Sequence, residues 1–346
     1  MYFMEEFKRH LRGERFVNDP SVAIQVEGLT KDFKGLVAVN RVSFRVPAGE
    51  IFGFLGPNGA GKTTMVKMLC TLLRPTAGMA WIAGYDVERE PNRVRKSLGI
   101  IFQDPSLDDR LTAWENLRFH GIIYKVPRRD LSARIEQALT LMELADRADD
   151  LVRNFSGGMK RRLEIARGLL HAPKVLFLDE PTIGLDPQTR HRIWEYLLKL
   201  RQENSITLFM TTHYMDEAEY CDRIAIIDNG AIIALDTPSQ LKTVVQGDVI
   251  SLQTGDNTRA KSELERKYAV SPRQDSQGLH FEVSNGAAFI PRVVRELEVP
   301  VTAASVRQPT LEDVFLKITG RKIRDDGASG SDRLKSTMRR MGRRWR

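Results

Sequence analysis

The sequence predicts an α/β fold followed by a smaller α+β domain, and three observations lead to this fold class. A glycine loop at residues 56–63 stands between a short apolar run and a segment with apolar residues at helical spacing. Several other runs before residue 236 are continuously apolar, which is typical of strands covered on both faces. After residue 237, strand-like and helix-like segments alternate again.

The glycine loop fits the phosphate-binding pattern G-x-x-x-x-G-K-[ST]. It reads Gly56, Pro57, Asn58, Gly59, Ala60, Gly61, Lys62 and Thr63, and it is followed directly by Thr64. Glycines let backbone N–H groups turn inward around phosphate oxygens, and a helix N-terminus adds its positive dipole end. We therefore expect residues 56–64 to bind a nucleotide, with Lys62 reaching the β- and γ-phosphates and Thr63 placed to ligate Mg²⁺. The alternative is a plain glycine turn ending in Lys-Thr.

Most of the expected strands in the large domain are apolar runs of four or five residues. They are residues 23–27, 43–46, 51–55, 98–102, 175–179, 207–211 and 224–228. Between Gln103 and Asn154 the pattern becomes helical, since Thr112 to Glu115 fits a capping box and later apolar positions fall three and four apart. A helical insert, at about residues 104–152, therefore interrupts the α/β domain.

Four stretches make up the chain. Residues 1–21 form an N-terminal extension and residues 22–236 the α/β domain. Residues 237–320 form the small α+β domain, in which we expect strands at 249–252, 279–283 and 299–306 and a final helix capped by Thr310. Residues 321–346 form a basic tail expected to be disordered.

The composition is that of a globular protein without membrane spans. The chain has 346 residues, 28% of them charged, and no run approaches the roughly 18 apolar residues of a spanning helix. Its only cysteines, Cys70 and Cys221, lie in apolar surroundings and are expected to be buried thiols in a reducing cytoplasm. The net charge of +8 is concentrated in the tail, residues 321–346, which contain ten Lys/Arg and three Asp. The remainder is close to neutral, so no nucleic-acid partner is expected.

Two further segments complete a candidate catalytic site. The apolar run before Asp179 and Glu180 predicts a strand with two acids at its end. Asp179 is then placed to hydrogen-bond the Mg²⁺ shell beside Thr63, and Glu180 to polarise an attacking water. At residues 156–158, the sequence Ser156-Gly157-Gly158 predicts an N-cap with bare backbone N–H groups, a second anion site.

Together these motifs resemble those of the ATP-binding cassette (ABC) ATPases. Six motifs occur in the same order as in that family. They are the phosphate loop, Gln103 after a strand, the Ser-Gly-Gly signature, the Asp179-Glu180 strand end, Gly184-Leu185-Asp186, and His213 after the next strand. The resemblance covers about residues 22–236. It implies an ABC-type P-loop NTPase domain with a helical subdomain insert.

The resemblance also implies roles for individual residues. ATP is expected between two head-to-tail cassettes, with Lys62 and Thr63 of one facing the Ser156–Gly158 turn of the other. Gln103 is expected to contact Mg²⁺ or the attacking water, and His213 to hold the γ-phosphate. Asp186 is expected to signal across the dimer.

In the family, an aromatic residue near the first strand stacks on the adenine. The resemblance makes Phe33 the candidate for this role here. Family members usually carry Tyr, and Phe keeps the stacking face without the hydroxyl. The signature departs from the common L-S-G-G-Q by having Phe155 and Met159 at its ends. Met159 is therefore not expected to be a ligand.

Two segments are similar to ATPase subunits of ABC-2-type exporters, including the daunorubicin/doxorubicin resistance group. They are the signature region and residues 308–320, Gln-Pro-Thr-Leu-Glu-Asp-Val-Phe-Leu-Lys-Ile-Thr-Gly. This similarity implies an ATP hydrolase that drives a separate ABC-2-type permease, pairs with a second cassette of the same or related sequence, and lies at the cytoplasmic face of the membrane. An importer ATPase and a soluble non-transport ABC ATPase are the alternatives.

The basic tail has three interpretations. It is a solvated end, a contact with anionic lipid headgroups through Arg339, Arg340, Arg343, Arg344 and Trp345, or a nucleic-acid-binding segment. The first is the default and the last is the least favoured.

Overall fold

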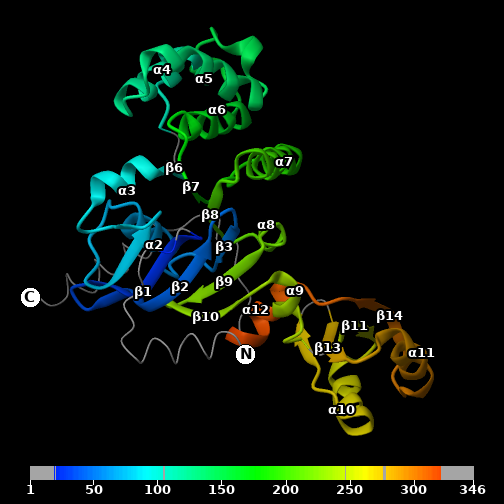
Figure 1. The fold of residues 1–346 in the computed structure, drawn as a ribbon. Coiled ribbons are helices and arrows are strands. Elements are labelled where there is room, and N and C mark those ends of the chain that lie inside the picture. Colours follow the sequence, from blue (N-terminus) through cyan, green and yellow to red (C-terminus); the bar gives the residue numbers. More distant parts are fainter. Residues whose placement is uncertain (1–18, 20, 104–105, 246, 276–277, 321–346) are drawn as a thin grey trace, which may run out of the picture. The chain divides into compact units, whose positions relative to one another are not determined.

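The computed structural model describes residues 19, 21–103, 106–245, 247–275 and 278–320. They form two compact units (Figure 1), which are described separately. The first unit comprises the described residues through Leu55 and from Gly59 to Leu235, and the second comprises Asp236 onward together with Gly56–Asn58. Nearly all of the expected N-terminal extension and all of the expected tail lie outside the described residues.

A six-stranded sheet forms the centre of the first unit, in the order β10-β9-β3-β8-β7-β6. The pairings of β3 with β8 and β9, of β7 with β8 and of β6 with β7 are all parallel. Its strands are β3 (Ile51–Leu55), β6 (Leu98–Ile101), β7 (Val175–Asp179), β8 (Thr207–Thr212), β9 (Arg223–Asp228) and β10 (Ala231–Asp236). Every residue of β3, β7 and β8 is buried, as their continuously apolar sequences predict.

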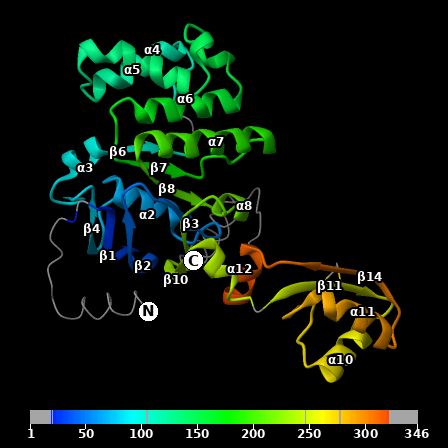
Figure 2. The ribbon, with the colours of Figure 1, turned by 45° about the vertical axis from the view of Figure 1, so that its right-hand side comes forward.

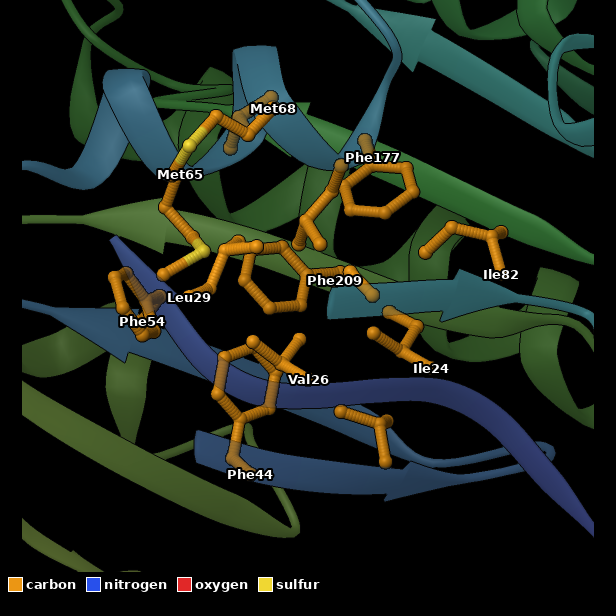
Figure 3. Close-up of a cluster of buried hydrophobic side chains, with 14 of the residues drawn as sticks. Ile24, Val26, Leu29, Phe44, Phe54, Met65, Met68, Ile82, Phe177 and Phe209 are labelled. Atoms are coloured by element: carbon orange, nitrogen blue, oxygen red, sulfur yellow. The ribbon is translucent and has the colours of Figure 1, made fainter. Parts of the chain in front are cut away.

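An antiparallel sheet in the order β2-β1-β4-β5 forms a second layer. Its strands are β1 (Val22–Phe33), β2 (Leu36–Pro47), β4 (Ala77–Ile82) and β5 (Tyr85–Asp86). Between the two sheets lies a core in which the Phe209 ring stacks on or tilts against the rings of Phe44, Phe52, Phe54 and Phe177 (Figure 3). Met65 and Met68 extend this core from the helix that follows β3.

Helices of the first unit connect these strands. They are α2 (Lys62–Leu69), α3 (Pro91–Ser97), α4 (Ala113–Ile123), α5 (Arg128–Leu141), α6 (Gly157–Leu169), α7 (Pro187–Asn204) and α8 (Met215–Ala218), with 3-10 turns at Ala145–Arg147 and Val152–Asn154. The predicted capping box of Thr112 and Glu115 is present at the start of α4. Helices α4, α5 and α6 pack on one another (Figure 2). The expected helical insert is therefore present, and it packs against α6, the helix that begins at the Ser-Gly-Gly signature.

The second unit contains an antiparallel sheet in the order β12-β13-β11-β14. Its elements are α9 (Pro238–Lys242), β11 (Asp248–Thr254), α10 (Asn257–Tyr268), β12 (Arg273–Asp275), β13 (Gly278–Val283), α11 (Gly286–Glu296), β14 (Val301–Arg307) and α12 (Leu311–Thr319). Its core includes Ile250, Leu264, Phe281 and Val293. The predicted cap by Thr310 is present at the start of α12, as part of a capping box with Asp313.

Some strands differ from the sequence-based expectation. Three strands were expected in the second unit, and the structure has a fourth, β12, whose three residues are all exposed and carry no apolar pattern. In the first unit β4, β5 and β10 were not expected. The sequences of β4 and β10 are apolar runs, so these two strands were missed although they show the pattern, and β5 has only two residues.

No helix within the described ranges is long and apolar enough to cross a membrane.

We expect Phe209→Ala to lower the free energy of unfolding by about 3–5 kcal/mol, because it leaves a cavity among four aromatic rings. Phe209→Leu should cost much less, and Phe119→Ala, at a side chain that is 61% exposed, should change stability by under about 0.5 kcal/mol. Urea unfolding followed by circular dichroism measures all three. Equal midpoints for Phe209→Ala and Phe119→Ala would contradict this account of the core.

Candidate active site

The candidate residues meet at one edge of the six-stranded sheet. In the parallel register Leu55 is opposite Thr212, Asp179 is opposite Thr211, and Ile101 is opposite Leu178. The chain therefore leaves β3, β8, β7 and β6 at the same edge, and ligand sites of open α/β sheets lie beyond the carboxyl ends of their strands.

The loop after β3 is shaped by its glycines. Gly59 and Gly61 have φ values of 81° and 106°, a region that side chains other than glycine rarely adopt. A Cβ added to Gly61 would also lie 2.3 Å from the carbonyl oxygen of Ala38. Helix α2 begins directly afterwards at Lys62, so its N-terminal N–H groups and its positive dipole end face the end of this loop. This is the local structure that phosphate binding requires.

Lys62, Glu180 and His213 form a buried polar cluster. The Nζ of Lys62 lies 3.2 Å from Oε1 of Glu180, and Nδ1 of His213 lies 3.3 Å from the same oxygen. Burial opposes ionisation of Glu180, but the hydrogen bond from His213 and the charge of Lys62 outweigh it, and the pKa of Glu180 is lowered. Burial lowers the pKa of Lys62, and Glu180 offsets part of that effect. The cluster thus holds an ionised carboxylate at the end of β7.

Glu180 is also held in an uncommon backbone conformation. Its φ is 49°, in the left-handed region that costs a non-glycine residue of order 1 kcal/mol or more. Its N–H donates to both the carbonyl oxygen and the hydroxyl of Thr211, each at 3.1 Å. These bonds to the neighbouring strand keep the carboxylate at a defined place relative to β8.

Thr63 and Asp179 bring two hard oxygen atoms together at the start of α2. The Thr63 hydroxyl donates to Oδ1 of Asp179 at 3.4 Å, and the Thr211 hydroxyl donates to the same oxygen at 2.5 Å. A hydroxyl and a single carboxylate fit Mg²⁺, which takes few protein ligands and completes its shell with water and phosphate oxygens. Among the residues that the structure describes, no group of three or more His, Cys, Asp or Glu side chains could form an all-protein metal cage.

Three further predicted residues, Gln103, Phe33 and Asp186, belong to other elements. Gln103 follows the end of β6, is exposed, and makes no hydrogen bond within the described ranges. Phe33 ends β1 and is 44% exposed, with Nζ of Lys31 5.2 Å from its ring centroid. Asp186 caps α7 by accepting from the N–H of Thr189 at 3.0 Å.

The signature turn begins α6. The Ser156 hydroxyl accepts from the N–H of Met159 at 3.3 Å, as its predicted N-cap role requires. A Cβ on Gly158 would lie 2.6 Å from Cγ2 of Thr189, so the turn packs closely against the first turn of α7. These contacts join the signature turn to the region after Glu180.

Arg161 on α6 is a buried residue that the sequence analysis did not select. Its Nε donates to the carbonyl oxygen of Pro181 and its Nη1 to that of Phe102, both at 2.5 Å, while Nη1 lies 3.0 Å from Oε2 of Glu164. Glu164 in turn accepts from the N–H of Ser106 at 2.8 Å. The signature helix is therefore tied both to the segment around Gln103 and to the loop that carries Glu180.

Glu217 on α8 is a second buried residue of this kind, and it is 1% exposed. Its Oε1 accepts from the hydroxyl of Thr182 and its Oε2 from that of Thr212, the latter at 2.5 Å. Burial raises the pKa of Glu217 from its ordinary 4.5 to about 7, although the Thr212 hydrogen bond and the charges of Arg190 and His213 act in the other direction. Its spacing of four residues after His213 was the only sequence signal, and the spacing alone does not predict burial.

Two cavities lie elsewhere in the first unit. The larger, of about 870 Å³, is lined by residues at the amino ends of the strands, such as Lys174 and Thr207, and lies away from the cluster. The smaller, of about 460 Å³, is lined by Phe102, Ser106, Phe119, Ile123 and Arg167, among others. We call it the α4–α6 groove. Phe119, Ile122 and Ile123 on α4 are each more than half exposed.

Comparisons with known proteins agree with this geometry. The family model described as ABC transporter matches residues 39–183. The daunorubicin/doxorubicin resistance ATP-binding protein of Streptomyces peucetius is 38% identical over 88% of this chain and 95% of its own length. The linearmycin resistance ATP-binding protein of Bacillus subtilis is 37% identical over 87% of this chain and its full length. The Nod factor export ATP-binding protein I of Rhizobium meliloti strain 1021 is 39% identical over 88% of this chain and 90% of its own.

Solved structures are similar as well. CbiO1 of Clostridium perfringens, part of the ABC transporter complex cbiONQ, matches with a TM-score of 0.61 at 26% identity, over 72% of this chain and 96% of its own. A dimeric ATP-binding cassette solved after hydrolysis, with ADP and Pi bound, matches with a TM-score of 0.57 at 28% identity, over 62% of this chain and 98% of its own.

We expect Glu217→Gln to gain stability relative to wild type as the pH rises. The raised pKa favours the neutral carboxyl in the fold, so this contribution is complete below about pH 4.5 and is lost as the pH rises through about 7. The glutamine stays neutral, and the difference at pH 8 should reach at most about 3 kcal/mol. Thermal melts of both proteins from pH 5 to pH 8 measure it. Asp216→Asn, at the exposed neighbour, is the control, and a pH-independent difference for Glu217→Gln would contradict the assignment.

Proposed function

Because this chain belongs to the ABC transporter family, as an ATP-binding and ATP-hydrolysing subunit similar to the daunorubicin/doxorubicin resistance proteins, we propose that it drives export through a separate ABC-2-type membrane permease. ATP would bring two cassettes together and hydrolysis would release them, at the cytoplasmic face of the membrane. The observation that carries the catalytic part is the cluster of Lys62, Glu180 and His213 beside Thr63 and Asp179 at one sheet edge.

In this proposal each residue of the cluster has one task. Glu180, kept ionised by Lys62 and His213, accepts a proton from the water that attacks the γ-phosphate. Lys62 exchanges its ion pair with Glu180 for the phosphate oxygens of ATP, which frees the carboxylate when substrate is present. His213 hydrogen-bonds the γ-phosphate. Thr63 and Asp179, with Gln103, would hold Mg²⁺, which neutralises phosphate charge when bound.

The second anion site supports a dimer. Ser156, Gly157 and Gly158 present the N-terminus of α6, so the chain carries a second anion site besides its phosphate loop. A second cassette, identical or related, is the natural source of the phosphate it would bind. Phe33 would stack on the adenine and Asp186 would signal between the two cassettes.

Export is favoured over import by the relatives. Two of the similar proteins are named for drug resistance and one for Nod factor export, at 37–39% identity over nearly the whole chain. The permease would dock in the α4–α6 groove, because the face of α4 beside it leaves Phe119, Ile122 and Ile123 exposed. A contact of the basic tail with anionic lipid would add to this attachment.

Glu180→Gln should bind ATP with little change in affinity yet hydrolyse it at least about 100-fold more slowly, because the amide cannot accept the proton. With ATP and Mg²⁺ this variant should also accumulate as a dimer in size-exclusion chromatography with light scattering. Lys62→Ala is the contrasting variant and should lose affinity in calorimetry. Wild-type turnover by Glu180→Gln would refute its assigned role, and a strictly monomeric sample would refute ATP-driven pairing.

Ile123→Asp should abolish co-purification with the membrane permease while leaving ATPase activity of the isolated subunit within about twofold, because a charge is placed on an apolar docking face. Val294→Asp on α11 is the matched control, since Val294 is also an exposed helical side chain, 49% exposed against 56% for Ile123. Detergent pull-down from membranes, with the retained polytopic protein identified by mass spectrometry, measures both. Full retention of the permease by Ile123→Asp would exclude the α4–α6 groove as the docking site.

A further inference from the structure

The Glu217 carboxyl joins the two loops that carry the proposed catalytic residues. Thr182, which donates to one of its oxygens, comes two residues after Glu180. Thr212, which donates to the other, directly precedes His213. The two loops leave different strands, β7 and β8, and this carboxyl bonds a side chain of each.

We propose that Glu217 is a positioning residue for ATP hydrolysis, a clamp that holds the Glu180 loop and the His213 loop at the separation which hydrolysis requires. The separation in question is the 3.3 Å between Nδ1 of His213 and Oε1 of Glu180. Glu217 contacts neither reacting atom in this proposal and acts through its two threonines. The inference rests on the roles proposed above for Glu180 and His213.

Burial makes this clamp stiff. Thr182 is fully buried, and Thr212 and Glu217 are each 1% exposed. Hydrogen bonds to a carboxyl are stronger in such surroundings than in water, and leaving one unmade is costly. Water is therefore a poor substitute for either threonine, and the two loops are expected to move together.

The backbone of Glu217 is anchored as well. Its carbonyl oxygen accepts from the N–H of Tyr220 at 3.2 Å and from Sγ of Cys221 at 3.9 Å. Cys221 in turn packs against Gly53 of β3, where an added Cβ would lie 2.8 Å from Sγ. The clamp is thus fixed to the strand that leads into the phosphate loop.

Several charged or titratable groups face Glu217 from the surrounding elements. They are Arg190 of α7, Arg161 of α6, and Glu180, His213 and Cys221. Among the described contacts, the carboxyl oxygens of Glu217 bond the two threonine hydroxyls and form no ion pair with either arginine. A residue that served only to neutralise a buried arginine would be paired with it directly, so the contacts favour a link between the two loops.

The test compares three nearly isosteric variants of the full chain: Glu217→Gln, Thr182→Val and Thr212→Val. Steady-state ATPase assays with Mg²⁺ should show kcat reduced about tenfold in each, with KM for ATP within about twofold, because the clamp orients the hydrolytic groups and leaves the phosphate loop intact. The double variant Thr182→Val/Thr212→Val should have a kcat only slightly lower than either single variant, because loss of one of the two hydrogen bonds already uncouples the loops. Asp216→Asn should behave as wild type.

A pH profile separates positioning from a merely structural role. The ionised carboxyl accepts freely from both hydroxyls, whereas the protonated carboxyl carries an O–H that must itself donate. Wild-type kcat should therefore rise with a midpoint near pH 7, and Glu217→Gln should lack that rise while keeping the rest of the profile. Thermal melts exclude misfolding as the cause. The proposal is overturned if the variants keep wild-type kcat, if their losses are additive, or if their pH profiles coincide with that of wild type.

Failure of this inference is distinguishable from failure of the proposed function. If Glu180→Gln hydrolyses ATP normally, the catalytic assignment is wrong and the clamp with it. If Glu180→Gln is inactive and the Glu217 and threonine variants are unimpaired, only the clamp is refuted.

Discussion

The parallel register of β3, β8, β7 and β6 is the constraint on which the rest of this molecule depends. Lys62, His213 and Glu180 are far apart in the chain, and they meet because the strands that precede them are neighbours ending at one edge. The register is held by the aromatic core around Phe209, which joins β8 to β3, β7 and the antiparallel sheet. A packed core thus sets a distance of a few ångströms between charged groups at its rim.

At that rim, charge balance explains why buried ions are tolerated. A lone carboxylate at the position of Glu180 would be costly. Lys62 pairs with it, and Nδ1 of His213 lies 3.3 Å from the same oxygen. In this arrangement the Lys62 amine and the Glu180 carboxylate form an ion pair. A triphosphate would compete for the lysine, so substrate binding and release of the catalytic carboxylate are naturally coupled in the proposed mechanism.

Helix α6 links this site to the rest of the first unit. It carries the signature turn at its start, Arg161 and Glu164 within its body, and part of the α4–α6 groove further along. Arg161 of α6 donates hydrogen bonds to the carbonyl oxygens of Phe102, which lines the groove, and of Pro181, which follows Glu180. A movement of α6 would therefore displace both the groove and the Glu180 loop. Such a buried, hydrogen-bonded connection is a physical route by which a docked permease could influence hydrolysis.

The α/β class, the phosphate loop, the capped helices and the family could be predicted from the amino-acid sequence. They depend on local spacing: glycines before Lys62, an apolar run before Asp179 and an N-cap at Ser156. We missed β4 and β10 although their sequences are apolar runs, and β12 has three exposed residues with no strand pattern. The fold was needed to show that Glu180 lies beside both Lys62 and His213, and that Arg161 and Glu217 are buried near the proposed catalytic loops. Those contacts join residues from different strands and helices, and local sequence carries no signal for a partner that folding alone brings near.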